Sequence, residues 1–329
     1  MVQASLSLTL TSPSGRAVTF PNRALLAPME GVTDPAFRRV VLGLGHAGGA
    51  CTEFQRITTH PLSRKVARRE LGERHPQIPT GIQIMAAAPD HVAESVRRCE
   101  EVGAPFVDLN FGCPVKCVFG KGAGAALLDA PHKVGAIVAA AVGAATVPVT
   151  AKIRAGVDDA SRLGEVVAAV ADAGAAALTV HARLRRDSYD APARWEWIAA
   201  CVAAAPTGLV VIGNGGIEHA ADVQRMLDAT GCDAVMVGRA AMRDPFLFGE
   251  VLGHAAAEPA AAARFLLDYD GAMHGAQRYR LGRLKQLVRV YDAGRLFSPE
   301  TRRDILRAHD ASLLRAGCHA RIETGVLRP

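Results

Sequence analysis

The chain has 329 residues, of which half are hydrophobic and 21% are charged. This composition excludes a disordered chain and is typical of one large globular domain or two smaller ones. No apolar run reaches the roughly 18 residues of a transmembrane helix, and the N-terminus lacks the pattern of a secretory signal. We therefore expect a cytoplasmic protein with no membrane partner.

Seven cysteines are scattered through the chain. Their odd number and irregular spacing give no disulfide framework, which fits a reducing cytoplasm. Cys113 and Cys117 are the closest pair, but no further Cys or His stands near them at zinc-like spacing. We therefore expect no metal site.

The net charge of +6 is concentrated at one end of the chain. Residues 260–329 hold 13 Lys+Arg and 7 Asp+Glu, so the rest of the chain is neutral. A neutral body with a basic tail indicates a polyanionic partner such as a nucleic acid. A solvated helical surface is the alternative interpretation of the same charges.

Eight short apolar runs alternate with helix-like segments rich in Ala, Val and Leu. They cover residues 24–28, 48–54, 81–85, 106–110, 147–154, 177–183, 209–216 and 233–240. Strands that are apolar on both faces and alternate with helices predict a parallel sheet. Eight such units in about 250 residues predict a (β/α)₈ TIM barrel. An open doubly wound sheet is disfavoured, because no G-x-G-x-x-G follows the first strand.

The pattern changes after residue 255. The segment 256–265 resembles a hinge or a helix start, and the stretches 266–275, 279–294 and 298–317 have the spacing of amphipathic helices. Ser298 followed by Pro299 is a typical helix N-terminus. We therefore predict a barrel domain over 1–255 and a small all-α domain over 256–329.

In such barrels the chemistry lies at the carboxyl ends of the strands. The last two strands end in "GNGGI" (213–217) and "GRAAM" (238–242). Glycines there allow close approach of backbone N–H groups to a ligand, and this position is the usual phosphate site of the barrel. Ordinary tight turns are the alternative.

Basic and polar residues end several other strands. Lys152 and Arg154 point to the same face of one strand, where cations require an anionic partner such as a reduced flavin. A pair of long basic side chains that reach the surface at the edge of the strand is the alternative. His181 alone is as typical of a core residue as of a ligand contact. Gln83 can hydrogen-bond a planar heterocycle or the backbone. Pro28, Met29 and Glu30 lie at the junction of the first strand with its loop, although Met29 alone is typical core filler.

The fourth strand ends in "DLNFGCP" (108–114). A thiol with an ordinary pKa near 8.5 is mostly protonated at neutral pH, so Cys113 can donate a proton to carbon. It can also act as a nucleophile, or be an inert buried cysteine. Its place at a strand end, between Gly112 and Pro114, favours a role in the site.

These motifs together resemble the tRNA-dihydrouridine synthases. The resemblance rests on "APMEGVTD", "GIQIM", "DLNFGCPVKCVFGKGAGAALL", "VTAKIRAG", "LTVHAR", "VIGNGGI" and "VMVGRAAM". It covers residues 24–249 closely and the basic tail more loosely. It implies an FMN-bearing barrel followed by a helical tRNA-binding domain, with NADPH as the reductant of the flavin.

The resemblance also implies residue roles. Cys113 would protonate C5 of a uracil whose C6 receives hydride from the flavin. Positions matching FMN contacts are Pro28, Met29, Glu30, Gln83, Lys152, His181, Asn214, Gly215, Gly216, Gly238 and Arg239, and positions matching uracil contacts are Asn110, Arg154 and Tyr189. Tyr189 is otherwise interpreted as a surface aromatic. The tail arginines would contact tRNA phosphates. The basic residues of the stretch 56–74 extend this surface, and a solvated charged loop or helix is the alternative interpretation of that stretch.

The sequence also gives an expectation for which uridine of the tRNA is modified. "MEG" after Pro28 and "YRLGRLKQLVRVY" in the tail resemble the bacterial group that acts on U16. The same reaction at U20 or U17 is an alternative, as is another FMN barrel enzyme such as a dihydroorotate dehydrogenase, which needs no basic tail. A non-catalytic tRNA-binding protein would need neither Cys113 nor Lys152. We expect a monomer without an obligate protein partner.

Overall fold

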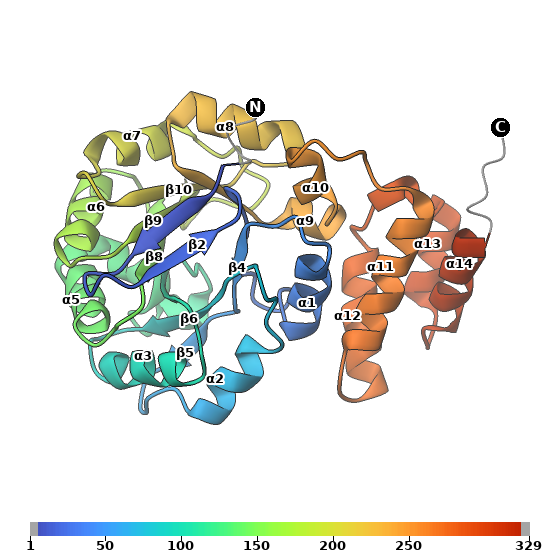
Figure 1. Ribbon diagram of the computed structural model, residues 1–329, viewed down its shortest axis with the longest axis horizontal. Helices are drawn as coiled ribbons and strands as arrows, with labels where there is room; N and C mark the ends of the chain where they lie inside the picture. The colour runs from blue at the N-terminus through green and yellow to red at the C-terminus, as the bar shows by residue number, and fades with distance from the viewer. Residues whose placement is uncertain (1–5, 324–329) are drawn as a thin grey trace.

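The computed structural model describes residues 6–323. A barrel of strands surrounded by helices occupies most of the molecule, and the C-terminal helices form a separate layer against one side of it (Figure 1). None of the helices within the described range is both long and apolar enough to cross a membrane.

Eight parallel strands close the barrel. In chain order they are β3 (Ala24–Leu26), β4 (Gly49–Cys51), β6 (Thr80–Ala86), β7 (Val107–Phe111), β8 (Val149–Gly156), β9 (Ala177–Leu184), β10 (Val210–Asn214) and β11 (Ala234–Val237). Each pairs with its neighbours in the chain, and β11 pairs with β3 to complete the ring. A short extra strand, β5 (Gln55–Ile57), adds to β6. The predicted TIM barrel is thus confirmed, and every predicted strand is present with slightly different ends.

Helices connect the strands on the outside. They are α1 (Pro35–Gly43), α2 (Arg64–Leu71), α3 (Val92–Glu101), α4 (Lys116–Phe119), the 3₁₀ helix η2 (Gly124–Asp129), α5 (Pro131–Val142), α6 (Leu163–Asp172), α7 (Glu196–Ala204), α8 (Ala220–Thr230), α9 (Arg239–Arg243) and α10 (Leu247–Val251). Their apolar faces cover strands that are buried on both sides. This double burial is why the strands show continuous apolar runs rather than alternation.

An N-terminal hairpin closes the end of the barrel opposite the strand carboxyl ends. Its strands are β1 (Leu8–Thr11) and β2 (Ala17–Phe20), paired antiparallel. Their inward residues share a core with the first residues of β9 and β11, and Phe20 meets Phe106 edge-on at 5.4 Å. The hairpin therefore fills the barrel floor with side chains.

Four helices follow the barrel: α11 (Pro259–Ala272), α12 (Gln277–Val288), α13 (Pro299–Arg307) and α14 (Ser312–Glu323), with a short 3₁₀ turn η3 (Ala293–Arg295). The Ser298 hydroxyl accepts a hydrogen bond from the backbone N–H of Thr301, which confirms the predicted helix start. The predicted stretch 298–317 is two helices rather than one, because residues 308–311 leave the helical conformation.

The first of these helices packs directly on the barrel. Phe37 of α1 contacts Phe265 and Tyr269 of α11, with ring centroids 6.3 and 5.7 Å apart. Edge-to-face aromatic pairs of this kind add to the free energy of apolar burial. The barrel and the C-terminal helices consequently share one continuous core.

Candidate functional site

A cavity of about 450 Å³ opens at the carboxyl ends of the barrel strands. Strand-end residues from β3, β7, β8, β9, β10 and β11 line it. The predicted site residues among them are Pro28, Met29, Glu30, Asn110, Cys113, Lys152, Arg154, His181, Tyr189, Asn214, Gly215, Gly216, Gly238 and Arg239. The structure therefore brings together all the predicted site residues except Gln83.

The sheet register explains why these residues meet. Asn110 on β7 lies opposite Lys152 on β8, and His181 on β9 lies opposite both Arg154 on β8 and Asn214 on β10. The Lys152 ammonium donates a hydrogen bond of 2.9 Å to the Asn214 side-chain oxygen. Residues scattered over 100 positions of sequence thus meet at two successive levels of the barrel mouth.

Asn110 shapes the turn that presents Cys113. Its side-chain oxygen accepts hydrogen bonds from the backbone N–H groups of Gly112 and Cys113, at 3.1 and 3.0 Å. The amide folds the chain back directly after β7, so that the thiol faces the cavity. This turn explains the sequence Asn110-Phe111-Gly112-Cys113 at the end of β7.

Gln83 lies beneath the cavity wall instead of lining the cavity, and its side chain is fully buried. Its amide donates to Asp108 at 2.6 Å and accepts from Asn110 at 2.8 Å. Asp108 also accepts a hydrogen bond from Thr150 at 2.5 Å. This buried chain fixes which way the Gln83 and Asn110 amides point, because a carboxylate only accepts hydrogen bonds.

Positive charge is concentrated where β8, β9 and β11 end at the cavity. Lys152, Arg154, Arg183 and Arg239 surround His181, and its burial together with their charges holds the pKa of His181 well below its usual value. Burial lowers the pKa of Lys152 to about 8, the nearby Asp108 opposing this shift. A neutral imidazole and a partly desolvated ammonium among three guanidinium groups make a site for an anionic ligand.

The glycines at the ends of β10 and β11 leave room for that ligand. Gly215 has φ +104°, and a Cβ added there would come within 2.9 Å of the His181 ring. Gly216 has φ +76°, and a Cβ there would come within 3.0 Å of the Trp195 indole nitrogen. Only glycine fits both the left-handed backbone and the confined space.

The loop after β9 places Tyr189 over the cavity. Its ring stacks at 6.3 Å from His181, and the Arg154 and Arg239 guanidinium carbons lie 5.2 and 5.7 Å from the ring centroid. Arg154 is buried and fixed by hydrogen bonds to the carbonyls of Gly112 and Leu184, at 3.1 and 2.8 Å. The tyrosine ring remains half exposed, so one face is available to a planar ligand.

Burial raises the pKa of the Cys113 thiol above its ordinary value, and Glu30 adds to this effect. The thiol is therefore protonated at neutral pH. Arg183 was missed by the sequence predictions, although it belongs to the quoted "TVHAR" motif. It lines the cavity and lies 3.0 Å from the His181 Nε2 atom. Its spacing of two from His181 on a strand was the available signal.

These features fit FMN, the cofactor implied by the resemblance. Cationic groups and glycine backbone at the last strands suit a phosphate, and Lys152 with Asn214 offers polar contacts to a planar ring. Cys113 lies across the same cavity, where a substrate ring would have to stack.

Comparisons with known proteins identify the family of the chain. Residues 25–289 match the family model described as dihydrouridine synthase (Dus). The chain is 35% identical over 326 residues to the tRNA-dihydrouridine(16) synthase of Ralstonia nicotianae, covering 90% of this chain and 98% of that protein. It is also 40% identical over 234 residues to the tRNA-dihydrouridine synthase B of Pseudomonas aeruginosa, covering 71% of this chain and 70% of that protein.

A solved structure is similar at the level of fold. The histamine dehydrogenase of Rhizobium sp. 4-9 superposes with a TM-score of 0.60 at 13% identity, covering 98% of this chain and 64% of that longer chain. From the family model and the long match to the Ralstonia protein, the chain belongs to the dihydrouridine synthase family of FMN-dependent oxidoreductases.

Proposed function

We propose that this protein reduces the C5=C6 bond of U16 in tRNA to give dihydrouridine, with FMN as cofactor and NADPH as electron donor. The observation that carries the proposal is a protonated thiol, Cys113, facing the cation-lined strand-end cavity. The U16 position is supported by the names of two relatives, from Ralstonia nicotianae and Cupriavidus necator, both tRNA-dihydrouridine(16) synthases. The name synthase B on another relative keeps the position open to experiment.

The cofactor would be held along β8 to β11. Gly215, Gly216, Gly238 and Arg239, with Arg183, suit the phosphate, and Lys152 suits the ring system. His181 would remain neutral and position the phosphate or ring by hydrogen bonding. Gln83 would act through Asn110 and Asp108, since its amide is already engaged by both. The Pro28–Glu30 segment would close the opposite side of the cofactor.

The uracil would be bound between Cys113 and Tyr189. The remaining N–H of the Asn110 amide and the Arg154 guanidinium can bond the polar edge of the base, and the Tyr189 ring can cover it. FMN, once reduced by NADPH, would supply a hydride to C6 and return to its oxidised form, and the Cys113 thiol would give its proton to C5. The uridine must leave its stack to enter the cavity, as in other enzymes that act on a base.

The C-terminal helices would supply the tRNA contacts, so we assign catalysis to residues 1–255 and tRNA binding to residues 256–329. Several exposed arginines of these helices have no carboxylate partner among residues 6–323: Arg264, Arg278, Arg289, Arg295, Arg307 and Arg321. Such side chains provide salt-dependent affinity for phosphates. The basic stretch 56–74 contributes less free charge, because Arg64 and Arg69 are paired with glutamates.

The decisive experiment uses purified protein, NADPH and unmodified tRNA transcripts. Dihydrouridine is mapped by its block to reverse transcription after alkaline treatment, with U16→C, U17→C and U20→C transcripts as controls. We expect the product at position 16, and its loss only in the U16→C transcript. Product at 17 or 20 would overturn the position, and turnover of free dihydroorotate without tRNA would overturn the reaction.

A further inference from the structure

The loop between β3 and α1 forms one wall of the cavity. Pro28, Met29, Glu30 and Val32 line it, so the path of this short loop determines the shape of the cofactor site. Gly31 has φ +74°, and the backbone N–H groups of Val32 and Thr33 return to the Met29 carbonyl, each at 3.0 Å. The loop is thus a tight turn closed at its base.

Two carboxylates fix the turn from the barrel side. One oxygen of Asp34 accepts the backbone N–H of Phe37 at 2.8 Å and so caps α1. Glu53, in the loop after β4, accepts the backbone N–H of Val32 at 3.1 Å. Arg38 of α1 fixes the end of the turn next to α1, because its guanidinium donates a hydrogen bond to the Thr33 carbonyl at 2.5 Å.

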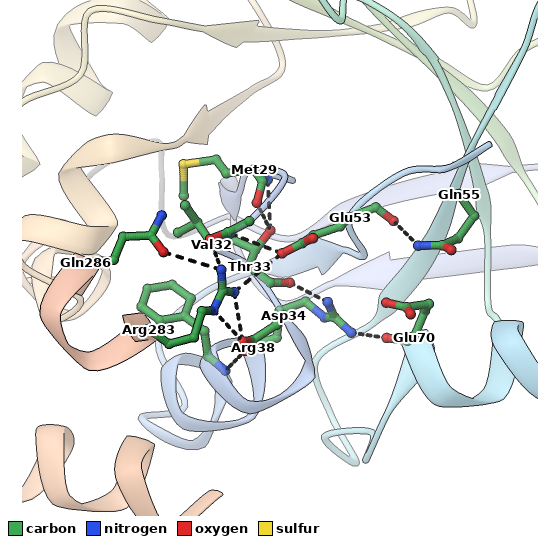
Figure 2. Close-up of polar contacts among 12 residues, drawn as sticks. Met29, Val32, Thr33, Asp34, Arg38, Glu53, Gln55, Glu70, Arg283 and Gln286 are labelled. Atoms are coloured by element: carbon green, nitrogen blue, oxygen red, sulfur yellow. Dashed lines mark hydrogen bonds and ion pairs between the residues drawn. The ribbon is translucent and has the colours of Figure 1, made fainter. Parts of the chain in front are cut away.

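The C-terminal helices reach the same turn through one residue. Arg283 of α12 donates to the second oxygen of Asp34 at 3.1 and 2.8 Å, and it also donates to the carbonyl of Gly31. Its guanidinium lies 3.7 Å from Glu53. Figure 2 shows Arg283 entering between Asp34 and the turn that carries Met29 and Val32. Asp34 and Gly31 are 249 and 252 residues away from Arg283 in sequence.

Arg283 differs from the other basic residues of the C-terminal helices by its burial. Only 11% of the Arg283 side chain is exposed, whereas 26% of Arg302 and 31% of Arg280 is exposed. Its acidic partners Asp34 and Glu53 are similarly buried, with 13% and 18% of their side chains exposed. A phosphate could reach this guanidinium only by displacing both carboxylates. Two N–H groups of the planar fork bond the Asp34 carboxylate while a third bonds the Gly31 carbonyl, and an ammonium, with all its donors on one nitrogen, does not reproduce this paired in-plane arrangement.

We propose that Arg283 is a positioning residue that holds the β3–α1 turn in its cofactor-binding shape and thereby couples the C-terminal helices to the flavin site. This inference rests on the proposed function, because the tRNA would bind the helices that Arg283 ties down. Loss of the guanidinium releases the Gly31 carbonyl and leaves Asp34 and Glu53 unpaired beside each other. The wall formed by Met29 and Glu30 then loosens even when no tRNA is present.

The test compares Arg283→Met with Arg280→Met as a matched control. Arg280 lies on the same helix and pairs with Asp270 of α11, at 2.8 Å, without touching the barrel. Both variants lose one positive charge. FMN release from diluted holoenzyme, without tRNA, is followed by the recovery of free-flavin fluorescence. We expect Arg283→Met to weaken FMN binding about fivefold, at the low end of typical site-to-site coupling, and Arg280→Met to leave it unchanged.

Two further variants keep the test decisive. Arg283→Lys retains the charge and tests the fork alone; should Arg283→Met fail to fold, the lysine variant replaces it, with about a twofold loss expected. Asp34→Asn retains an N-cap acceptor for α1 but not the charge, and should weaken FMN binding in the same direction. The double variant Asp34→Asn/Arg283→Met should bind FMN no more weakly than the single variant that has the lower FMN affinity, because both changes break the same contact.

The outcomes separate the two proposals. Unchanged FMN release in Arg283→Met and Arg283→Lys, with a raised KM for tRNA, would overturn the positioning role and assign Arg283 to direct tRNA contact. A wild-type protein that binds FMN but makes no dihydrouridine would instead refute the proposed function, while the FMN comparison would still decide the role of Arg283.

Discussion

Replacing Cys113 with alanine should separate the two half-reactions of the enzyme. The backbone N–H of Cys113, not its side chain, bonds to Asn110, so alanine preserves the turn after β7. The cavity loses one sulfur atom and the cations along β8 to β11 are unchanged. Flavin reduction by NADPH should therefore proceed normally, while reoxidation by tRNA loses its proton donor.

General acid catalysis typically contributes about 10²- to 10⁴-fold to a rate. We therefore expect reoxidation by tRNA to slow by that factor in Cys113→Ala, which corresponds to about 3–5 kcal/mol in the activation barrier. The pH dependence gives an independent check. Burial raises the pKa of Cys113 above its ordinary value, so the thiol stays protonated at neutral pH. The wild-type rate should be insensitive to this thiol around neutral pH and fall in the alkaline range.

The assay is anaerobic stopped-flow spectroscopy in two mixes. Holoenzyme is first reduced with NADPH, and the reduced enzyme is then mixed with unmodified tRNA while flavin absorbance returns. Cys113→Ser, whose hydroxyl is a far weaker acid, serves as the isosteric variant. Reoxidation of Cys113→Ala by tRNA at the wild-type rate would refute the proton-donor role, and a rate that rises with pH would indicate a thiolate nucleophile instead.

Three further predictions concern the cofactor and the tRNA. Burial lowers the pKa of Lys152 from its ordinary value of 10.5 to about 8, so FMN affinity, measured by flavin fluorescence, should fall as pH rises through 8 in the wild type but not in Lys152→Met. The stability of the apoprotein, measured by thermal unfolding, should rise between pH 8 and 10.5 as this buried charge is neutralised, and an identical pH profile in Lys152→Met would contradict this. Gly215→Ala should weaken FMN binding at least tenfold from about 1–3 kcal/mol of backbone strain plus its clash with His181, whereas Gly208→Ala, with a similar φ of +100° in open space, should affect only stability. Replacing both Arg278 and Arg289 with alanine should make the slope of log K against log salt for tRNA less negative by roughly 0.7–0.9 per lost phosphate contact, and an unchanged slope would remove them from the interface.

The barrel was predictable because its strands are buried on both faces. Each appears as an uninterrupted apolar run bounded by turn residues, so both its existence and its order were readable. The predicted end of the last strand was three residues too long, because Gly238 already turns the chain into α9. The hairpin of β1 and β2 was not predicted, since two alternating strands of four residues give little periodic signal.

The site was predictable to the extent that it lies at strand ends. Strand register places Asn110 beside Lys152, and it places His181 beside Arg154, two residues further along β8, without further information. Gln83 lies beneath the cavity wall, and the sequence did not distinguish it from the residues that line the cavity. Alternation along a strand predicts which face of the sheet a side chain is on, but not how far below the cavity it lies. The contact of Arg283 with Asp34 was also beyond prediction, since it depends on how α12 docks on the barrel.

The hairpin at the barrel floor has a consequence for the order of events in catalysis. Leu10, Phe20 and Phe106 fill the floor, so within residues 6–323 the proposed flavin site opens at the strand-end mouth. A nicotinamide donor and a flipped uridine would both need the same face of the ring and would exclude one another. Steady-state kinetics should therefore follow a ping-pong scheme, with parallel double-reciprocal plots and competitive inhibition of tRNA reduction by excess NADPH.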